Sequence, residues 1–396
     1  MDYVQQLRTL EQAQLLRTPP TVDWRDGVYC GVGGQRYLTF CSNDYLGLSQ
    51  HPKVVEAATK AMGEFGLGST ASHMVVGHSR YHHELEAHMV EHMPWSGGVL
   101  MASGYVANLA IIQALCGRHH TVFQDRLNHA SLLDAARLSG AKLVRYAHND
   151  VGDLRARVPD SHQPSVIVSD GVFSMDGDVA DVVGLAEVAQ SIRAPLVIDD
   201  AHGFGVLGAN GEGSVVAQHI PPAQVEFNVC TFGKAMGTMG AVVMGDRDAV
   251  EWLKQKARPY IYSTAMPPSI AAASLAAFEV MIDEPERRQQ LASRIAQFRA
   301  GAKALGLELL PSQTAIQPIV LGSAERALAW SDHLKSSGVL VSAIRPPTVP
   351  TGAARLRITL SAEHTTDEVD RLLNALAEAK RAEALEQGEH SDEALS

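Results

Sequence analysis

Cysteine is scarce in this chain of 396 residues, and long hydrophobic runs are lacking. The four cysteines, Cys30, Cys41, Cys116 and Cys230, form no C-x-x-C pair, which predicts reduced thiols, as in cytosolic proteins, rather than a disulfide framework. Because no apolar stretch approaches the length of a membrane helix, no membrane span is expected. The first twenty residues, MDYVQQLRTLEQAQLLRTPP, are polar and lack an apolar signal core, so we expect an amphipathic helix there.

Positive charge is also in deficit. Lysine and arginine number 33 against 44 aspartate and glutamate residues, which gives a net charge of −11. This acidic surplus argues against nucleic acid or an anionic membrane as a partner. With 46% hydrophobic and 19% charged residues, the chain can bury a sizeable core. Its length predicts one large domain and a smaller one.

Short apolar segments alternate with helical patterns from Val99 onward, which predicts βαβ units, a mostly parallel sheet and an α/β fold. The predicted strands are Val99–Ala102, Thr121–Gln124, Lys142–Tyr146, Ser165–Ser169, Pro195–Ile198 and Glu226–Cys230. Ligands of such sheets bind at the carboxyl ends of the strands. We therefore expect the functional residues in the loops that follow the strands.

The remaining segments divide the chain into an N-terminal arm (1–45), a large domain (46–275), a small C-terminal domain (276–385) and a disordered acidic tail (386–396). Proline marks the helix ends: Pro19 stops a first helix from Met1 to Leu16, Pro52 opens another, and Pro285 interrupts a helical stretch. The other predicted elements are strands at Gln35–Cys41, Ile316–Leu321, Val339–Ser342 and Arg355–Leu360, and helices at Pro52–Met62, Glu325–Ser337 and Thr366–Glu386.

One lysine stands in an unusual setting. Lys234 lies in Thr231-Phe-Gly-Lys-Ala-Met-Gly-Thr-Met-Gly240, among small and apolar residues. It is either an ordinary surface-turn lysine or an amine in a tight, partly desolvated pocket, where a neutral lysine forms a Schiff base with an aldehyde. The neighbouring glycines would let a flat cofactor approach the backbone closely.

Other strand-end residues suit a pyridine ring that carries an aldehyde and a phosphate. Asp199 closes the apolar strand PLVID and could hold a protonated ring nitrogen, while His202 could donate to a ring oxygen and His129 could stack on the ring. The alternatives are a capping or solvated acid at 199, a turn histidine at 202 and a helix-start residue at 129. Thr231 and the helix start at Ser103–Tyr105 could hold the phosphate.

These segments together resemble a known family. DDAHGFG and TFGKAMGTMG are similar to the lysine motif of the α-oxoamine synthases, which depend on pyridoxal phosphate, and SNDYLGLS, DGVFSMDGD and IYSTAMPP also match. The resemblance covers about Leu16 to Ala377. AIQPIV and AIRPPTVPTGAARLRITLSAEH resemble the biotin-pathway branch most. The resemblance to this family implies an aminotransferase-like fold of type I. Such a fold has a large domain with a mostly parallel seven-stranded sheet and a smaller C-terminal α+β domain.

The resemblance also implies a role for each matching residue. Lys234 corresponds to the Schiff-base lysine, Asp199 to the partner of the pyridine nitrogen and His129 to the ring stacker. Further cofactor contacts correspond to Gly104, Tyr105, Ser174, His202 and Thr231, with Thr264 reaching the phosphate from a partner subunit of a homodimer. Implied substrate-binding residues are Arg17, Asn43, His129, Thr348 and Arg357, the last clamping the amino-acid carboxylate.

The implied reaction is a decarboxylative condensation of L-alanine with a pimeloyl thioester, carried by coenzyme A or an acyl carrier protein, in the cytoplasm. One alternative is another enzyme of the family that uses glycine and acetyl-CoA. Others are an aminotransferase or aldolase of the same fold, or a catalytically silent cofactor-binding module. Activity that needs no thioester would indicate an aminotransferase or aldolase, and a module would form no product.

Two features of residues 68–92 stand apart. The family loop GSGGS reads Gly68-Ser69-Thr70-Ala71-Ser72 here, and a positive φ at Thr70 or Ala71 would be costly. This departure bears on the wall of the acyl site.

A cluster of histidines follows, with His88 and His92 four residues apart. Because Leu85, Met89 and Met93 give this helix an ordinary core stripe, no metal site is expected.

Overall fold

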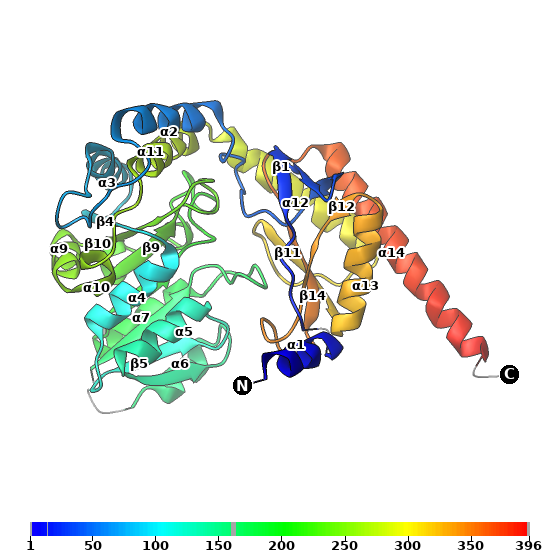
Figure 1. Cartoon of the computed structure of the whole chain (residues 1–396). Coiled ribbons are helices and arrows are strands. Elements are labelled where there is room, and N and C mark those ends of the chain that lie inside the picture. Colours follow the sequence, from blue (N-terminus) through cyan, green and yellow to red (C-terminus); the bar gives the residue numbers. More distant parts are fainter. Residues whose placement is uncertain (1, 14, 160–163, 394–396) are drawn as a thin grey trace. The chain divides into compact units, whose positions relative to one another are not determined.

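The computed structural model describes residues 2–13, 15–159 and 164–393, and it divides into two compact units (Figure 1). The large unit comprises Asn43–Ser174 and Asp178–Arg288. The small unit comprises Met1–Ser42, Met175–Gly177 and Gln289–Ser396. The segment 1–42, expected as part of a separate arm, therefore groups with the C-terminal segments, and each unit is described by itself below.

A seven-stranded sheet of order β4-β10-β9-β8-β7-β5-β6 forms the centre of the large unit (Figure 1). Its strands are β4 (Gly97–Met101), β5 (Thr121–Asp125), β6 (Lys142–Tyr146), β7 (Ser165–Asp170), β8 (Leu196–Asp199), β9 (Phe227–Thr231) and β10 (Ala241–Gly245). Only β10 runs antiparallel to its neighbours, β4 and β9. The predicted α/β class and mostly parallel sheet are confirmed, and all six predicted strands form within one or two residues of their expected bounds.

Strand β10, which directly follows the turn that holds Lys234, was not predicted. Its residues AVVMG are all buried, and so are those of β4, β5 and β9. A strand buried on both faces has no polar alternation to reveal it, so a short apolar run after a glycine turn is easily missed.

Helices of the large unit begin where capping residues or prolines allow. Pro52 opens α2 at its first turn, and the side chains of Ser103, Asp150 and Asp181 accept hydrogen bonds from the first turns of α4, α6 and α7. The bounds are α2 (Pro52–Phe65), α3 (Arg80–His92), α4 (Gly104–Leu115), α5 (Ala130–Ser139), α6 (Val151–Arg157), α7 (Val182–Ile192), α8 (Ser214–Ala217), α9 (Arg247–Lys256), α10 (Arg258–Ile261) and α11 (Pro268–Asp283). Helix α11 packs against both α2 and α3.

The small unit holds two sheets. One has the order β1-β2-β3-β12 and the other β11-β14-β13. Their bounds are β1 (Val22–Asp26), β2 (Tyr29–Val32), β3 (Gln35–Thr39), β11 (Ile316–Gly322), β12 (Val339–Leu340), β13 (Ser342–Ile344) and β14 (Ala354–Thr359). The predicted strand Val339–Ser342 is thus two strands in different sheets, because β12 pairs with β3 and β13 pairs with β14. Strands β1 and β2 were not predicted, and β1 is exposed along its whole length.

The helices of the small unit are α1 (Tyr3–Gln12), α13 (Ala324–Ser336) and α14 (Thr366–Glu393), and α12 (Glu286–Ala304) begins just before the unit boundary. The break expected at Pro285 separates α11 from α12. Helix α14 continues past the predicted Glu386 into the segment expected to be disordered, and residues 394–396 lie outside the described residues. Among the described residues, no helix has both the length and the apolar character that crossing a bilayer requires.

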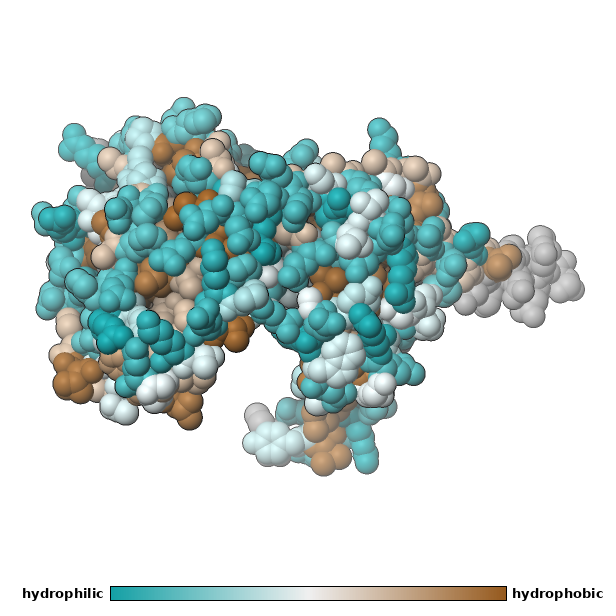
Figure 2. Space-filling view, turned by 90° about the horizontal axis from the view of Figure 1, so that it is seen from above, coloured by the Kyte–Doolittle hydropathy of each residue, from teal (hydrophilic) through white to brown (hydrophobic). Residues whose placement is uncertain are grey.

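The core of the large unit is built from the apolar strands and the inner faces of the helices. Val99, Ile111, Val168, Val229 and Val243 are inaccessible to solvent in one cluster that spans β4, α4, β7, β9 and β10. Polar residues predominate on the face in Figure 2, with hydrophobic residues in scattered patches between them. Because both faces of the sheet are buried, the strands are held in one arrangement, and so are the loops at their ends.

The loop 68–72, in which Thr70 and Ala71 replace two glycines of the family, contains one strained residue. Thr70 has a φ of 60°, whereas Ala71 is not among the residues with positive φ. The expected cost therefore falls on Thr70 alone. The loop is held by a hydrogen bond from the Ala265 N–H to the Ala71 carbonyl (2.9 Å) and one from the Ser69 hydroxyl to the Met266 carbonyl. A β-branched residue in the left-handed region is kept there by these contacts.

We expect Thr70→Gly to raise the free energy of unfolding by about 0.5–1 kcal/mol. The left-handed conformation costs an L-residue about 1–2 kcal/mol, and part of this gain is lost to the greater freedom of glycine in the unfolded chain. Thr70 is exposed, so little packing is lost. Ala71→Gly is the matched control and should lower stability by about 0.4–1 kcal/mol. Urea unfolding of both variants measures the difference, and shifts of the same sign would contradict it.

Candidate active site

A cavity of about 320 Å³ opens at the carboxyl ends of the parallel strands, wholly within the large unit. It is lined by loops that follow β4, β5, β7, β8 and β9, as expected for an open parallel sheet. The lining residues are Asn43, Ser103, Gly104, Tyr105, His129, Asp170, Val172, Ser174, Asp199, Ala201, His202, Thr231, Gly233, Lys234, Met239 and Gly240.

Nine residues singled out in the sequence lie together in this lining. They are Asn43, Gly104, Tyr105, His129, Ser174, Asp199, His202, Thr231 and Lys234. Four others do not line the cavity. Thr264 is exposed and forms an antiparallel bridge with Ser72. Arg17, Thr348 and Arg357 belong to the small unit, where Arg17 Nη2 donates to Thr348 Oγ1 at 2.8 Å and Arg357 is buried in β14.

Lys234 sits in a tight turn between β9 and β10. The turn is closed by hydrogen bonds from Phe232 N–H to Gly240 C=O and from Gly237 N–H to the Lys234 carbonyl. Gly237 has a φ of 65°, and a Cβ there would lie 2.3 Å from the Ser49 nitrogen, so this turn needs glycine. Lys234 is half-buried, and its Nζ lies 3.5 Å from Thr231 Oγ1. Its amine therefore faces the cavity rather than open solvent.

Asp199 ends β8 and is nearly buried. Its Oδ2 accepts a hydrogen bond from Asn108 Nδ2 at 2.5 Å, and its Oδ1 accepts one from the Ala201 N–H at 3.1 Å. Asn108 lies on α4, has no exposed surface and also donates to Ser131 Oγ at 2.8 Å. Hydrogen bonds of this kind stabilise the charged form of a carboxylate. Asn108 thereby fixes the orientation of Asp199 at the cavity wall.

Asp170, the neighbour of Asp199 on β7, adds a second buried carboxyl group. Burial raises its pKa well above the ordinary value, and the charge of Asp199 raises it further. The Asp170 carboxylate accepts from the His129 N–H at 3.0 Å, and its Oδ1 has no hydrogen-bond partner among the described residues. Two acids side by side in a dry wall favour a cation in the cavity.

His129 caps α5 and faces the same acids. Burial lowers its pKa, the charge of Asp199 opposes this shift, and Lys234 adds to it. A neutral imidazole presents a flat face without a competing charge. His129 also fills the helix-start role given as its alternative in the sequence, because its Nδ1 accepts a hydrogen bond from the Ser131 N–H at 3.3 Å.

His202 is held by a hydroxyl group. Its Nδ1 lies 2.7 Å from Tyr45 Oη, which in turn lies 3.2 Å from Asn43 Oδ1. This chain of contacts joins the turn before α2 to the loop after β8. The contact with Tyr45 fixes the orientation of the His202 ring at the wall of the cavity.

The start of α4 lies at the cavity wall, close against Thr231 of the lysine loop. The Ser103 hydroxyl accepts from the Val106 N–H at 3.2 Å, and a Cβ on Gly104 would lie 2.5 Å from Thr231 Cγ2. Glycine is therefore required where α4 approaches the lysine loop. Unpaired N–H groups at a helix start bind phosphate readily. Tyr105 at the rim donates its hydroxyl to Asp134.

Taken together, the cavity offers an amine, a pair of buried acids, a flat imidazole and a phosphate cradle. Such a set suits an aromatic cation that carries an aldehyde and a phosphate. The chain belongs to the aminotransferase class I and II family, whose model matches residues 35–376. The family model gives the general class of protein, and individual relatives show which members of that class the chain resembles.

The chain is 49% identical to the 8-amino-7-oxononanoate synthase of Pseudomonas paraeruginosa strain PA7, over 96% of this chain and 95% of that protein. A solved 8-amino-7-oxononanoate synthase from Francisella tularensis is 32% identical with a TM-score of 0.77, covering 88% of this chain and 99% of that one. A serine palmitoyltransferase from S. paucimobilis, with a bound PLP–myriocin aldimine, is 30% identical with a TM-score of 0.90, covering 96% and 97%. These likenesses confirm the predicted fold of type I.

Three residues of the site were missed in the sequence. Asn108 left a signal, because it is the buried polar residue of a helix, GYVANLAIIQAL, that is otherwise apolar on its inner face. Asp170 directly follows a predicted strand and could have been found by the same rule as Asp199. Tyr45 is nearly inaccessible and lies in a turn, and nothing in its local sequence indicates its contact with His202.

Asp125 ends β5 outside the cavity and braces the neighbouring loops. It accepts from Leu127 N–H (2.7 Å) and Asn149 N–H (2.6 Å), and lies 3.0 Å from His148 Nδ1. The second ring nitrogen of His148 lies 3.0 Å from Asp178 Oδ2. Although burial lowers the pKa of His148, the hydrogen bonds to Asp125 and Asp178 more than offset this, and the pKa rises to about 9.

We therefore expect His148→Gln to destabilise the protein in a pH-dependent way. Since the folded pKa exceeds that of the unfolded chain, the stabilisation is complete below about pH 6.5 and is lost as the pH rises through about 9. The loss should be ~2–3 kcal/mol near pH 6 and small above pH 9.5. Urea unfolding at both pH values tests this, and an equal loss at both would contradict it.

Proposed function

We propose that this chain condenses L-alanine with a pimeloyl thioester, releasing carbon dioxide and giving 8-amino-7-oxononanoate, a step of biotin synthesis, with pyridoxal phosphate as cofactor. The observation that carries the chemistry is the meeting of Lys234 and Asp199 in one cavity. The choice of substrates is supported by 49–50% identity to proteins named 8-amino-7-oxononanoate synthase over most of the chain.

The residues present fit pyridoxal phosphate. Lys234 would hold the aldehyde and Asp199 the ring nitrogen, beside the buried carboxyl group of Asp170. The start of α4, where no Cβ fits at Gly104, would hold the phosphate with Tyr105 and Thr231. His129 would lie against the ring, and Ser174 and His202 near its oxygen.

When bound, the cofactor supplies a cationic ring that stabilises negative charge at the α-carbon of alanine. Asp199 would face the ring nitrogen, because Asn108 and the Ala201 N–H hold its carboxylate in a fixed orientation. Lys234 is placed to remove the α-proton, because its half-buried side chain lines the same cavity as Asp199. Asn43, at the edge of the cavity, would contact the substrate.

Residues outside the cavity complete the proposal. Arg357 would bind the carboxylate of alanine through its two-pronged guanidinium group, and Arg17 with Thr348 would serve the acyl chain. Their mutual hydrogen bond supports a shared role for Arg17 and Thr348.

Thr264 would reach the phosphate of the other subunit in a homodimer. The reaction would run in the cytoplasm, where free thiols such as those of the four cysteines persist.

A second candidate is condensation with a different amino acid and acyl group. It is favoured by the TM-score of 0.90 to a serine palmitoyltransferase and by the altered loop at Thr70. Glycine with acetyl-CoA is the corresponding pair for a third member of the class. These candidates share the catalytic residues and differ in the pairs of substrates they accept.

Mass spectrometry of the products separates these candidates. Purified enzyme is incubated with alanine, glycine or serine, each combined with pimeloyl, acetyl or palmitoyl thioester. We expect 8-amino-7-oxononanoate as the main product and none from Lys234→Ala. A main product from glycine or serine would overturn the assignment of substrates, and turnover by Lys234→Ala would overturn the assignment of the catalytic amine.

Asn108 is expected to act by positioning Asp199. A hydrogen bond to a charged group contributes about 1.5–3 kcal/mol, so Asn108→Ala should lower kcat about tenfold to hundredfold. Asn228→Ala is the matched control, because Asn228 is equally buried, lies on β9 and donates to Cys230 rather than to Asp199. Steady-state kinetics of both variants tests this, and equal losses would show that burial of an amide, not its contact with Asp199, matters.

A further inference from the structure

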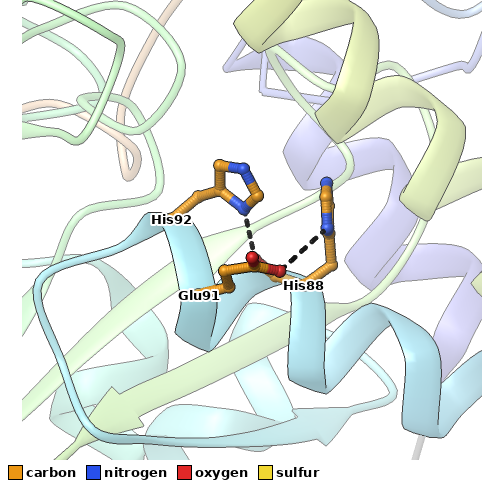
Figure 3. A group of neighbouring side chains, drawn as sticks. All are labelled: His88, Glu91 and His92. Atoms are coloured by element: carbon orange, nitrogen blue, oxygen red, sulfur yellow. Dashed lines mark hydrogen bonds and ion pairs between the residues drawn. The ribbon is translucent and has the colours of Figure 1, made fainter.

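Helix α3 carries three potential metal ligands on one turn of its surface, and none of them lines the cavity of the proposed reaction. They are His88, Glu91 and His92, in the spacing His-x-x-Glu-His (Figure 3). Residues three and four apart lie on the same face of a helix. One donor atom of each of the three side chains lies within 4.8 Å of a donor atom of each of the others.

The two imidazoles are held in place from α11. The ring of Phe278 is nearly perpendicular to both, at 5.8 Å from His88 and 6.1 Å from His92 between ring centres. The imidazoles themselves lie 4.2 Å apart. Phe278 is buried, so it provides a fixed support beneath two ligands that face outward. Such support lowers the entropy lost when the rings are fixed on an ion.

The tautomer of His92 also suits a ligand. Its Nδ1 lies 2.9 Å from the backbone carbonyl of His88, which can only accept a hydrogen bond. Nδ1 therefore carries the proton, and the lone pair of the neutral ring is on Nε2. A ligand histidine characteristically donates its other N–H to a carbonyl in this way.

Glu91 completes the set with a carboxylate. Its Oε2 lies 3.8 Å from His88 Nδ1, and its side chain is 72% exposed. A tetrahedral zinc ion, at about 2.0–2.1 Å from each ligand, requires about 3.3 Å between donor atoms. Rotation of the exposed Glu91 side chain can close the remaining distance between its carboxylate and His88.

The geometry points to a surface site for a divalent transition metal, of which zinc suits two imidazoles and one carboxylate well. Three protein ligands leave a fourth position to water. The site would tie one turn of α3 together and is independent of the proposed reaction. This proposal differs from the expectation, drawn from the core stripe of this helix, that these histidines bind no metal.

The test is a zinc titration of the cofactor-loaded enzyme, stripped of metal beforehand, against a chromophoric chelator. Hydrogen exchange of the α3 amides is measured with and without zinc. We expect a zinc site whose affinity falls about tenfold or more in His92→Ala and in Glu91→Gln by less, together with slower exchange in α3 of the parent enzyme. His219→Ala, at another exposed histidine, is the matched control and should bind zinc unchanged.

Because His92 is exposed, its replacement should leave the fold intact, and equal melting temperatures without zinc would verify this. Unchanged zinc affinity in His92→Ala would overturn the site, and so would the absence of any zinc effect on exchange in α3. Neither result would bear on the condensation reaction, which the product assay measures separately.

Discussion

Two buried carboxyl groups at the ends of adjacent strands are the constraint on which the site depends. Asp170 and Asp199 are direct neighbours in the register of β7 and β8, and each is almost inaccessible. Placing two negative charges in low dielectric is costly unless cations or hydrogen bonds compensate. Asn108, the His129 N–H and the Ala201 N–H provide hydrogen bonds, and Lys234 provides a positive charge close enough to lower the pKa of Asp170. A cationic ring in the cavity would complete the compensation, so the pair of buried acids favours the binding of such a cofactor.

The sequence allowed the parallel sheet and most of the cavity to be predicted for one reason. In a parallel sheet, all strand ends meet at one edge, so residues that follow separate strands converge without any knowledge of contacts. His129, Asp199 and Lys234 lie up to 105 positions apart along the chain, as 234 − 129 shows, and still line one cavity. The positions of these three residues directly after predicted strands were therefore sufficient to predict that they share one site.

What could not be predicted depends on contacts that leave no local pattern. Tyr45 reaches His202 across 157 positions, and β12 pairs with β3 across the two ends of the chain. Strand β1 (VDWRD) alternates apolar and polar residues over only five positions and buries neither face, so its pairing with β2 defines it more than its pattern does. At Thr70, the family comparison suggested a strained backbone at two positions, but only coordinates could assign the strain to one of them. In each case tertiary contacts, rather than local preference, determine the structure.

The adjacent acids of the Asp199-Asp200 pair show how a strand end separates two tasks. Successive side chains point to opposite sides, so Asp199 faces the cavity while Asp200 faces away from it into the protein. Asp200 Oδ2 accepts from the Ser214 N–H at 2.6 Å, and added Cβ atoms at Gly203 and Gly213 would lie 2.1 and 1.9 Å from its carboxylate. Burial raises its pKa to about 7. Asp200 thus anchors the glycine-rich loop from which His202 extends. Although Asp199 and Asp200 are adjacent in the sequence, only Asp199 lines the cavity, while Asp200 determines the shape of the loop around it.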